Sequence, residues 1–397
     1  MSTTDQIFCI RQIAQKSYDK NIETNHLFID FKAAYDSIYR EELWSIMSQF
    51  QFPHKLIRLI RATLEKVTCC VKVQGSMSHK FVSAVGLRQG DELSTKLFNI
   101  ALEGVVRRAK LEISGTIYHK SIQLLGFADD VDIVGRDIRS ITGAYSKLEK
   151  EANKIGLKIN ESKTKLLSIS PSNRTKNLLS SGYLEVDNKK FVVVKEFSYL
   201  GVLIDEKFTT SLEIKRRIVS AQRAFYGIRN ILTSKSVSRK AKFIMYKTLI
   251  RPVALYGSES WNTTVDDEER LSVFERKVLR TILGPVVENG EYRIRYNNEL
   301  YQIYQEPDIV TIVKINRLSW AGHVVRRPED STIYKIFKGD FVEGKRTRGR
   351  PKNTWMEAVE KDSSTLDIRN WQRQERDRSG YRRFLMEAKV PRGLHSQ

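Results

Sequence analysis

Apolar and polar positions in the first half of the chain follow two different periods. Ile7, Ile10, Ile13 and Ala14 recur at helical spacing and predict an amphipathic helix over residues 7–18. The same spacing predicts further helices, and compact apolar runs predict strands. The predicted helices cover 37–50, 94–110 and 141–156, and the predicted strands cover 26–30, 66–74, 80–85 and 165–170. Helices and strands are therefore mixed through about the first 200 residues.

Two hairpins are also predicted in this half. One turns at Asp129–Asp130, between the apolar stretches "LLGFA" and "VDIVG". The other pairs "KKFVVVKEF" (189–197) with "YLGVLI" (199–204). Both bring polar or glycine-containing turns to the end of apolar strands.

The pattern changes to long helices after about residue 207. Apolar stripes in a basic background predict helices over 210–232, 238–261 and 266–284. Pro252 should kink or end the second of these, and Gly284 should end the third. Beyond about residue 286 the periodicity weakens, and "EGKRTRGRPK" (343–352) has the composition of a flexible basic segment.

Composition is that of a globular protein. The 397 residues are 41% hydrophobic and 29% charged, which allows two or three packed domains. No apolar run approaches the roughly 20 residues that a membrane span needs, and the N-terminal segment lacks the features of a signal peptide. A nuclear or cytoplasmic location is therefore expected, and the three cysteines have neither zinc-site nor disulfide-framework spacing.

The net charge of the chain indicates which class of binding partner to expect. Lys and Arg number 68 against 47 Asp and Glu, so the net charge is +21. Because the basic residues recur along the whole chain, the excess favours nucleic acid as a polyanionic partner over a membrane surface. A basic protein without such a partner is the alternative.

The adjacent carboxylates of Asp129 and Asp130 stand between apolar residues, where burial of two like charges is costly. A two-metal site would justify them, because nucleotidyl transfer needs two divalent ions about 3.5–4 Å apart, held by carboxylates. Asp30, which ends the apolar strand "LFID", is the candidate third ligand. The alternative makes Asp130 a turn former and Asp129 a cap.

Five blocks in order resemble the reverse transcriptase of non-LTR (LINE-type) retrotransposons. "LFIDFKAAYDSIYREELW" is similar to motif A of that family, "GLRQGDELSTKLFNIALEGVV" to motif B and "LLGFADDVDIVG" to motif C. "ANKIGLKINESKTKLLSIS" resembles motif D and "FSYLGVLI" the primer-grip hairpin. The blocks span roughly residues 5–205, and an ordered set is far more specific than any one motif.

The resemblance implies roles for particular residues. Asp30, Asp129 and Asp130 would be catalytic and, with the backbone carbonyl of Phe31, would hold two Mg²⁺ ions, with Mn²⁺ as a possible substitute. Tyr35 would exclude ribonucleotides by contact at the sugar 2′ position, although a core aromatic is the alternative. Gln89 and Gly90 would contact the incoming nucleotide. Lys163 would protonate the pyrophosphate, unless it is a surface lysine, and Tyr199, Leu200 and Gly201 would position the primer terminus.

The chain departs from the family pattern in two places. Glu92 and Thr95 replace the two prolines that usually follow motif B's Gln-Gly. Only a short segment precedes Asp30, so the fingers subdomain and any N-terminal endonuclease are expected to be missing. That expectation keeps two readings open: an active polymerase, or a relic that binds nucleic acid without turnover.

The remaining basic residues are candidates for contact with nucleic acid. In the predicted thumb they are Lys215, Arg216, Arg223 and Arg229, and in the C-terminal segment they are Lys345, Arg346, Arg348, Arg350 and Lys352. The stretch "RGRPK" is similar to an AT-hook, which lies in the DNA minor groove. A basic linker with general phosphate affinity is the alternative.

The resemblance implies an α+β fold with three parts. Residues 1–206 would form a right-hand palm, an antiparallel sheet with helices, and 207–285 a helical thumb. Residues 286–397 would be a basic, partly flexible C-terminal region. The expected function is RNA-directed DNA polymerase, with an RNA template, a DNA primer and deoxynucleoside triphosphates as partners and no membrane.

Overall fold

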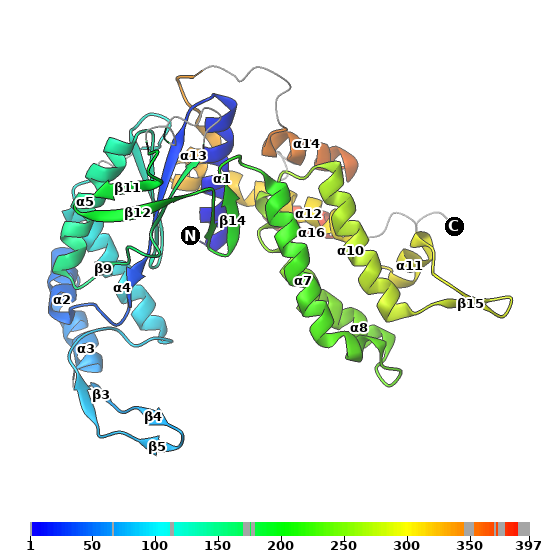
Figure 1. Cartoon of the computed structure of the whole chain (residues 1–397), viewed down its shortest axis with the longest axis horizontal. Helices are drawn as coiled ribbons and strands as arrows, with labels where there is room; N and C mark the ends of the chain where they lie inside the picture. The colour runs from blue at the N-terminus through cyan, green and yellow to red at the C-terminus, as the bar shows by residue number, and fades with distance from the viewer. Residues whose placement is uncertain are drawn as a thin grey trace. The chain divides into compact units, whose positions relative to one another are not determined.

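The computed structural model describes residues 2–65, 67–111, 115–169, 175, 179–344, 353–368, 371 and 378–387. They form two compact units (Figure 1). The first unit holds residues 20–197 and 341–344, and the second holds 2–19, 198–340 and the described residues after 352. No helix in the described part is long and apolar enough to cross a bilayer.

A six-stranded sheet forms the centre of the first unit, in the order β11-β12-β10-β1-β8-β7. Its strands are β1 (Thr24–Ile29), β7 (Ile122–Phe127), β8 (Asp130–Gly135), β10 (Lys165–Ile169), β11 (Tyr183–Val186) and β12 (Lys189–Val194). All neighbours are antiparallel except β10 and β12. The sheet is therefore mixed, whereas an antiparallel sheet was expected. The chain runs from β10 through β11 to β12, and β12 then pairs with β10 in the same direction.

The predicted hairpin between 189–197 and 199–204 is wrong in its first arm. Strand β12 pairs with β10 and β11, and Phe191 is buried in the sheet's core. The chain bends at Lys195, and only β13 (Glu196–Tyr199) pairs with β14 (Val202–Asp205).

The segment with two strands predicted on either side of the turn at 75–78 is broken into four shorter strands. These form two short pairs, β3 (Val67–Cys69) with β6 (Phe81–Ser83) and β4 (Lys72–Val73) with β5 (Ser76–Met77).

Helices pack on one face of the sheet (Figure 1). They are α2 (Arg40–Gln49), α3 (His54–Leu64), α4 (Glu92–Arg108) and α5 (Ile138–Lys154). Because side chains alternate along a strand, Leu27 and Ile29 of β1 join this core while Phe28 faces away and stacks on Phe197. The alternation fixes the register of the central strand, on which the candidate site depends.

The second unit is mostly helical. Its helices are α1 (Thr3–Asp19), α7 (Thr210–Thr233), α8 (Arg239–Met245), α9 (Arg251–Leu255), α10 (Val265–Leu283), α11 (Asn297–Tyr304), α12 (Ile309–Val325), α13 (Thr332–Lys338), α14 (Trp355–Thr365) and α16 (Arg378–Glu387). As predicted, the helix around Pro252 is interrupted, by a π-helical turn over Tyr246–Ile250, and Gly284 ends α10. The hairpin β15 (Val286–Glu288) and β16 (Glu291–Arg293) follows α10.

The two ends of the chain pack together within this unit. The ring of Phe8 in α1 lies 4.8 Å from that of Trp355 in α14 and 6.0 Å from that of Trp320 in α12. Arg317 and Asp362 form an ion pair at 3.0 Å, with both side chains almost fully buried. The described part of the C-terminal region thus includes packed helices, because aromatic residues spaced far apart in the sequence converge on α1.

A buried carboxylate lies at the centre of the second unit. Glu275 of α10 accepts hydrogen bonds from the hydroxyls of Tyr246 (2.8 Å) and Tyr301 (3.1 Å) and from the backbone N–H of Ile309 (2.8 Å). Burial nevertheless raises the pKa of Glu275 to about 7, because removal from water disfavours the carboxylate more than these donors stabilise it.

This raised pKa predicts how stability changes with pH. The folded state favours protonated Glu275, so its contribution is complete below the unfolded pKa of 4.5 and is lost as the pH rises through about 7. The loss should reach about 3 kcal/mol at most, at about 1.4 kcal/mol per pKa unit. Urea unfolding followed between these pH values should show a flatter pH dependence for Glu275→Gln than for the parent. Parallel curves for the two proteins would contradict the prediction.

Candidate active site

The first unit brings Asp30 and Asp130 to the same end of two adjacent strands. In the antiparallel pair β1–β8, Phe28 is opposite Asp132 and Ile29 is opposite Val131. The next step of this register places Asp30, the residue after β1, opposite Asp130, the first residue of β8. Opposite residues in such a pair have Cβ atoms about 5 Å apart and point to the same face. The sheet register therefore brings together two of the three predicted catalytic carboxylates.

Asp129 lies in the two-residue turn that joins β7 to β8. The turn consists of Ala128 and Asp129, since Phe127 pairs with Asp130. Ala128 has a φ of 51°, in the left-handed region that non-glycine residues rarely adopt, and such strain is concentrated at functional sites. Asp129 and Asp130 are both exposed in this hairpin, Asp129 in the turn and Asp130 at the start of β8, so the two carboxylates are not buried between the apolar strands.

The electrostatics of the tip show crowding of negative charge. Partial desolvation, followed by the nearby carboxylates of Asp129 and Asp30, raises the pKa of Asp130 to about 6. Aspartate oxygens are hard ligands of the kind that Mg²⁺ prefers, and a divalent cation would relieve this repulsion. The donor set therefore fits such an ion. Among the described residues, however, no group of three or more Asp, Glu, His or Cys side chains is close enough together to hold a metal ion.

Asp30 is held by a turn that follows the short strand pair β2 (Phe31–Lys32) and β9 (Lys158–Ile159). The side-chain amide of Asn160 donates to Asp30 Oδ2 at 3.0 Å, and the Asn160 backbone N–H donates to the Asp30 carbonyl at 2.7 Å. The hydroxyl of Thr164 accepts from the Asp30 backbone N–H at 3.3 Å. Asn160 and Thr164 were not predicted as site residues, although both lie in the motif D block.

The loop that carries Gln89 and Gly90 is fastened by Arg40. This guanidinium donates to the carbonyls of Gly86 (2.9 Å), Leu64 (2.8 Å), Ser83 (2.8 Å) and Val85 (3.0 Å). Desolvation, with Arg88 nearby, lowers the pKa of Arg40. Arg40 was not predicted as a site residue either, and it orders the chain immediately before the loop.

The predicted nucleotide contacts have different surroundings. Gln89 and Gly90 are exposed, and Gly90 has a φ of 87° with open space where a Cβ would stand, so backbone approach by a ligand is unobstructed. Tyr35 is half-buried and stacks on Phe98 at 4.7 Å between ring centroids, which fits a core aromatic as well as a sugar filter. Lys163 is exposed in the turn after Asn160.

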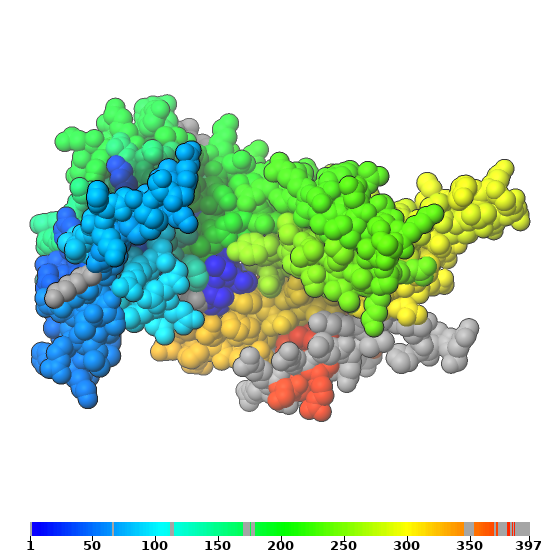
Figure 2. Space-filling model, turned by 90° about the horizontal axis from the view of Figure 1, so that it is seen from below, coloured from blue at the N-terminus to red at the C-terminus, as the bar shows by residue number. Residues whose placement is uncertain are grey.

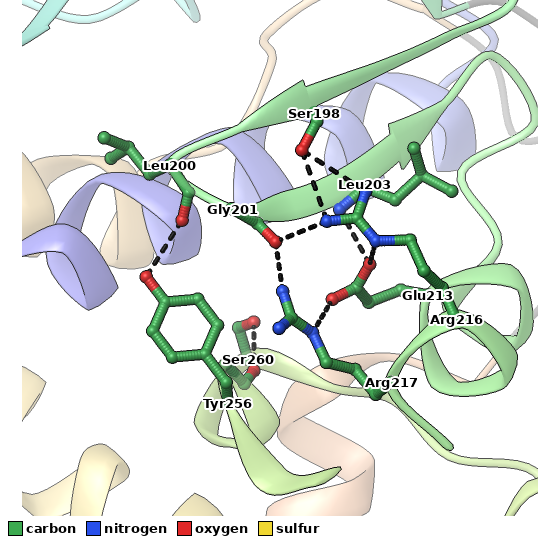
Figure 3. Close-up of polar contacts among 10 residues, drawn as sticks. Ser198, Leu200, Gly201, Leu203, Glu213, Arg216, Arg217, Tyr256 and Ser260 are labelled. Atoms are coloured by element: carbon green, nitrogen blue, oxygen red, sulfur yellow. Dashed lines mark hydrogen bonds and ion pairs between the residues drawn. The ribbon is translucent and has the colours of Figure 1, made fainter. Parts of the chain in front are cut away.

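The predicted primer-grip residues form a turn that belongs to the second unit, whose boundary lies between Phe197 and Ser198. Tyr199 is buried, and Leu200 and Gly201 form the turn between β13 and β14 with φ angles of 46° and 78°. The turn carbonyls accept hydrogen bonds from α7 and from the segment after α9 (Figure 3). This turn is therefore fixed by tertiary contacts as well as by strand pairing.

Three side chains hold the turn from outside (Figure 3). Tyr256 donates its hydroxyl to the Leu200 carbonyl at 2.9 Å, and Arg216 and Arg217 both donate to the Gly201 carbonyl. Glu213, which is fully buried, pairs with Arg217 and accepts the backbone N–H of Leu203 at 2.8 Å. We call Glu213, Arg216, Arg217 and Tyr256 the turn clamp.

The other predicted contacts with nucleic acid divide into two groups. Lys215, Arg223 and Arg229 are exposed on α7, whereas Arg216 is engaged by the turn. The basic residues of the C-terminal segment lie outside the described residues: Lys345, Arg346, Arg348, Arg350 and Lys352.

Comparison with known proteins confirms the resemblance to reverse transcriptases. Residues 2–204, just over half of the chain, match the family model of the reverse transcriptase (RNA-dependent DNA polymerase). The matched segment contains Asp30, the Asp129–Asp130 hairpin and the turn at Leu200–Gly201.

Relatives come from mobile elements. A transposon-derived protein of Caenorhabditis elegans is 26% identical over 62% of this chain and 88% of its own length. The RNA-directed DNA polymerase from the mobile element jockey of Drosophila melanogaster is 22% identical over 71% of this chain and 31% of its own length. The chain thus spans about a third of that polymerase.

Among solved structures, the telomerase of Candida tropicalis aligns over 84% of this chain and 56% of its own, with a TM-score of 0.39 and 14% identity. The match to the family model and the named relatives carry the assignment. The chain belongs to the reverse transcriptase family, as it occurs in non-LTR retrotransposons.

Proposed function

We propose that the chain carries the polymerase centre of an RNA-directed DNA polymerase, in which Asp30, Asp129 and Asp130 hold two divalent metal ions. The observation that carries the proposal is the β1–β8 register, which sets Asp30 opposite Asp130 beside the turn that bears Asp129. Reverse transcriptases in general use divalent metal ions. When bound, such ions activate the primer 3′-hydroxyl and stabilise the charge that develops on the transferred phosphate.

The chain's own residues would position the reactants. Asn160 and Thr164 orient Asp30, and Arg40 orders the loop through which Gln89 and Gly90 would meet a deoxynucleoside triphosphate. Tyr35 would border the sugar, and Lys163 would supply a proton to the leaving pyrophosphate. Positioning and charge stabilisation supply most of the catalysis in phosphoryl transfer, so these supports matter as much as the ligands.

The proposal is tested by primer extension on an RNA template with a DNA primer, deoxynucleotides and Mg²⁺. Extension that requires all three carboxylates would support it. A protein that binds the template–primer but never extends it is the second candidate, and the same assay distinguishes the two. Replacing Mg²⁺ by Mn²⁺ in the same assay would show whether another ion serves.

The turn clamp predicts a positioning effect. Glu213→Gln keeps the shape of the side chain but removes the charge that pairs with Arg217, so the turn at Leu200–Gly201 should lose its fixed conformation. If the turn positions the primer terminus, the maximal extension rate should fall by on the order of 10- to 100-fold while template–primer affinity is retained.

Single-turnover kinetics and a binding titration separate the two effects. Tyr256→Phe, which removes only the hydrogen bond to Leu200, should give a smaller decrease in the same rate. Glu196→Gln, an exposed glutamate on β13, is the matched control and should extend like the parent. A decrease in affinity with an unchanged maximal rate for Glu213→Gln would assign the clamp to binding rather than positioning.

A further inference from the structure

The hairpin β15–β16 in the second unit exposes an apolar face. Its register pairs Val287 with Tyr292, so both side chains point to one face, and Ile294 two residues later continues that face. The three side chains are 58%, 79% and 72% exposed. Figure 2 shows the segment that contains this hairpin, in yellow, standing out at one end of the second unit. Exposed apolar clusters of this kind mark surfaces of interaction.

A groove leads from this face along α10. A cavity of about 500 Å³ is lined by Ile294 of the hairpin segment, by Val273 of α10 and by the cations Lys277, Arg280 and Arg295. A second cavity of about 360 Å³ shares Val273 and Lys277 with the first and continues between α7 and α10. Together they make one groove with an apolar floor, entirely within the second unit.

The rim of the groove is strongly positive. Lys215 and Arg270 border the second cavity, in addition to the three cations of the first. Arg280 donates to Asn297 Oδ1 at 2.7 Å and Arg295 to the Gly284 carbonyl at 3.1 Å, so neither of these bonds neutralises the charge. None of the five forms an ion pair with a described residue. The one acidic residue lining the cavities, Glu269, pairs with Arg276.

We propose that this groove and the Tyr292 face bind single-stranded nucleic acid. The cations would follow the phosphates, while Tyr292 and the apolar floor would take the faces of unstacked bases. The bases of a duplex are stacked on one another, so a duplex could place its phosphates against the basic rim but could not stack its bases on Tyr292 or the apolar floor. The surface goes beyond the proposed catalytic site: it uses none of that site's residues and needs neither metal ion nor nucleotide.

The test measures affinity for a fluorescent single-stranded RNA and for a blunt duplex, by anisotropy in EDTA without nucleotides. Tyr292→Ala should weaken binding of the single strand by about 5- to 100-fold, the range for loss of one base–aromatic stack. Its affinity for the duplex should be unchanged. Tyr292→Phe keeps the ring and should bind like the parent, as should Tyr183→Ala, which removes an exposed tyrosine from the sheet of the first unit.

Two further measurements check the phosphate contacts and the location. Lys277→Ala and Arg295→Ala should each reduce the slope of log affinity against log salt by about 0.7, the value per phosphate for single strands. Photocrosslinking with thiouridine-substituted RNA should label the peptide that contains Tyr292. An unchanged affinity of Tyr292→Ala for the single strand, or an equal loss for the duplex, would overturn the proposal and leave a surface for a protein partner.

Discussion

Replacing Asp30, Asp129 or Asp130 by alanine should lower the rate of primer extension by on the order of 10³-fold or more. The effect would be this large because, under the proposed function, these carboxylates hold the metal ions, and such ions supply several kcal/mol of transition-state stabilisation. Asp129→Ala and Asp130→Ala should fold normally, since both residues are exposed in the hairpin. Template–primer affinity should also be largely retained, because it depends on basic residues elsewhere in the chain.

A matched control exists in the same unit. Asp187 lies in the turn between β11 and β12 with a φ of 48°, a conformation that asparagine tolerates well. Asp187→Asn should therefore extend primers like the parent. The metal-site assignment would be wrong if Asp129→Ala and Asp187→Asn had equal rates. Absence of extension by the parent, with template–primer still bound, would favour the second candidate function.

Asp362→Ala should destabilise the second unit by about 3–5 kcal/mol. The variant leaves the guanidinium of Arg317 buried, with Thr263 Oγ1 at 3.1 Å as its remaining side-chain partner. Removing one member of a buried ion pair usually costs this much, because the other charge stays out of water. Urea unfolding followed by tryptophan fluorescence measures the effect, since four of the five tryptophans belong to this unit.

Two controls distinguish lost pairing from lost packing. The double variant Arg317→Met/Asp362→Leu removes both charges and should be close to the parent in stability, or above it. Glu185→Ala breaks the exposed pair with Lys190 in the first unit and should change stability by less than about 1 kcal/mol. If Asp362→Ala were equally mild, the C-terminal helices would contribute little to the fold.

The elements with strong periodicity could be predicted from the sequence. The helix at 7–18, the strand ending at Asp30 and the Asp129–Asp130 hairpin all occur in the structure, because local apolar spacing specifies them. Pairing between distant segments could not be predicted in the same way. The parallel contact of β12 with β10 depends on a crossover connection, and no local pattern records it.

The candidate site shows the same division. Resemblance to a family predicts the carboxylates and the glycine turns, which carry distinctive residue types. Asn160, Arg40 and Glu213 make their contacts with other segments of the chain. Within its own segment each looks like an ordinary polar residue, so the sequence alone does not predict these contacts. The motif D spacing was the one signal that could have found Asn160.

The expected palm, thumb and tail differ from the compact units. Helix α1 (Thr3–Asp19), expected within the palm, packs in the second unit. Trp355 and Arg317 join the described region after 286 to the same unit. Part of the weak amphipathic pattern in that region comes from α12, whose apolar residues lie around much of the helix. The functional division at 206 and 286 stays a prediction.

The packing of Phe8 against Trp355 has a consequence for synthesis on the ribosome. Nearly all of the first unit comes from the continuous segment 20–197, which can fold soon after it emerges. Helix α1 belongs to the second unit and lacks Trp320, Phe337 and Trp355 until the ribosome has made them. At ordinary translation rates this delay is on the order of tens of seconds. During it Ile7, Phe8 and Ile10, all buried in the finished protein, stay exposed to chaperones and to other nascent chains.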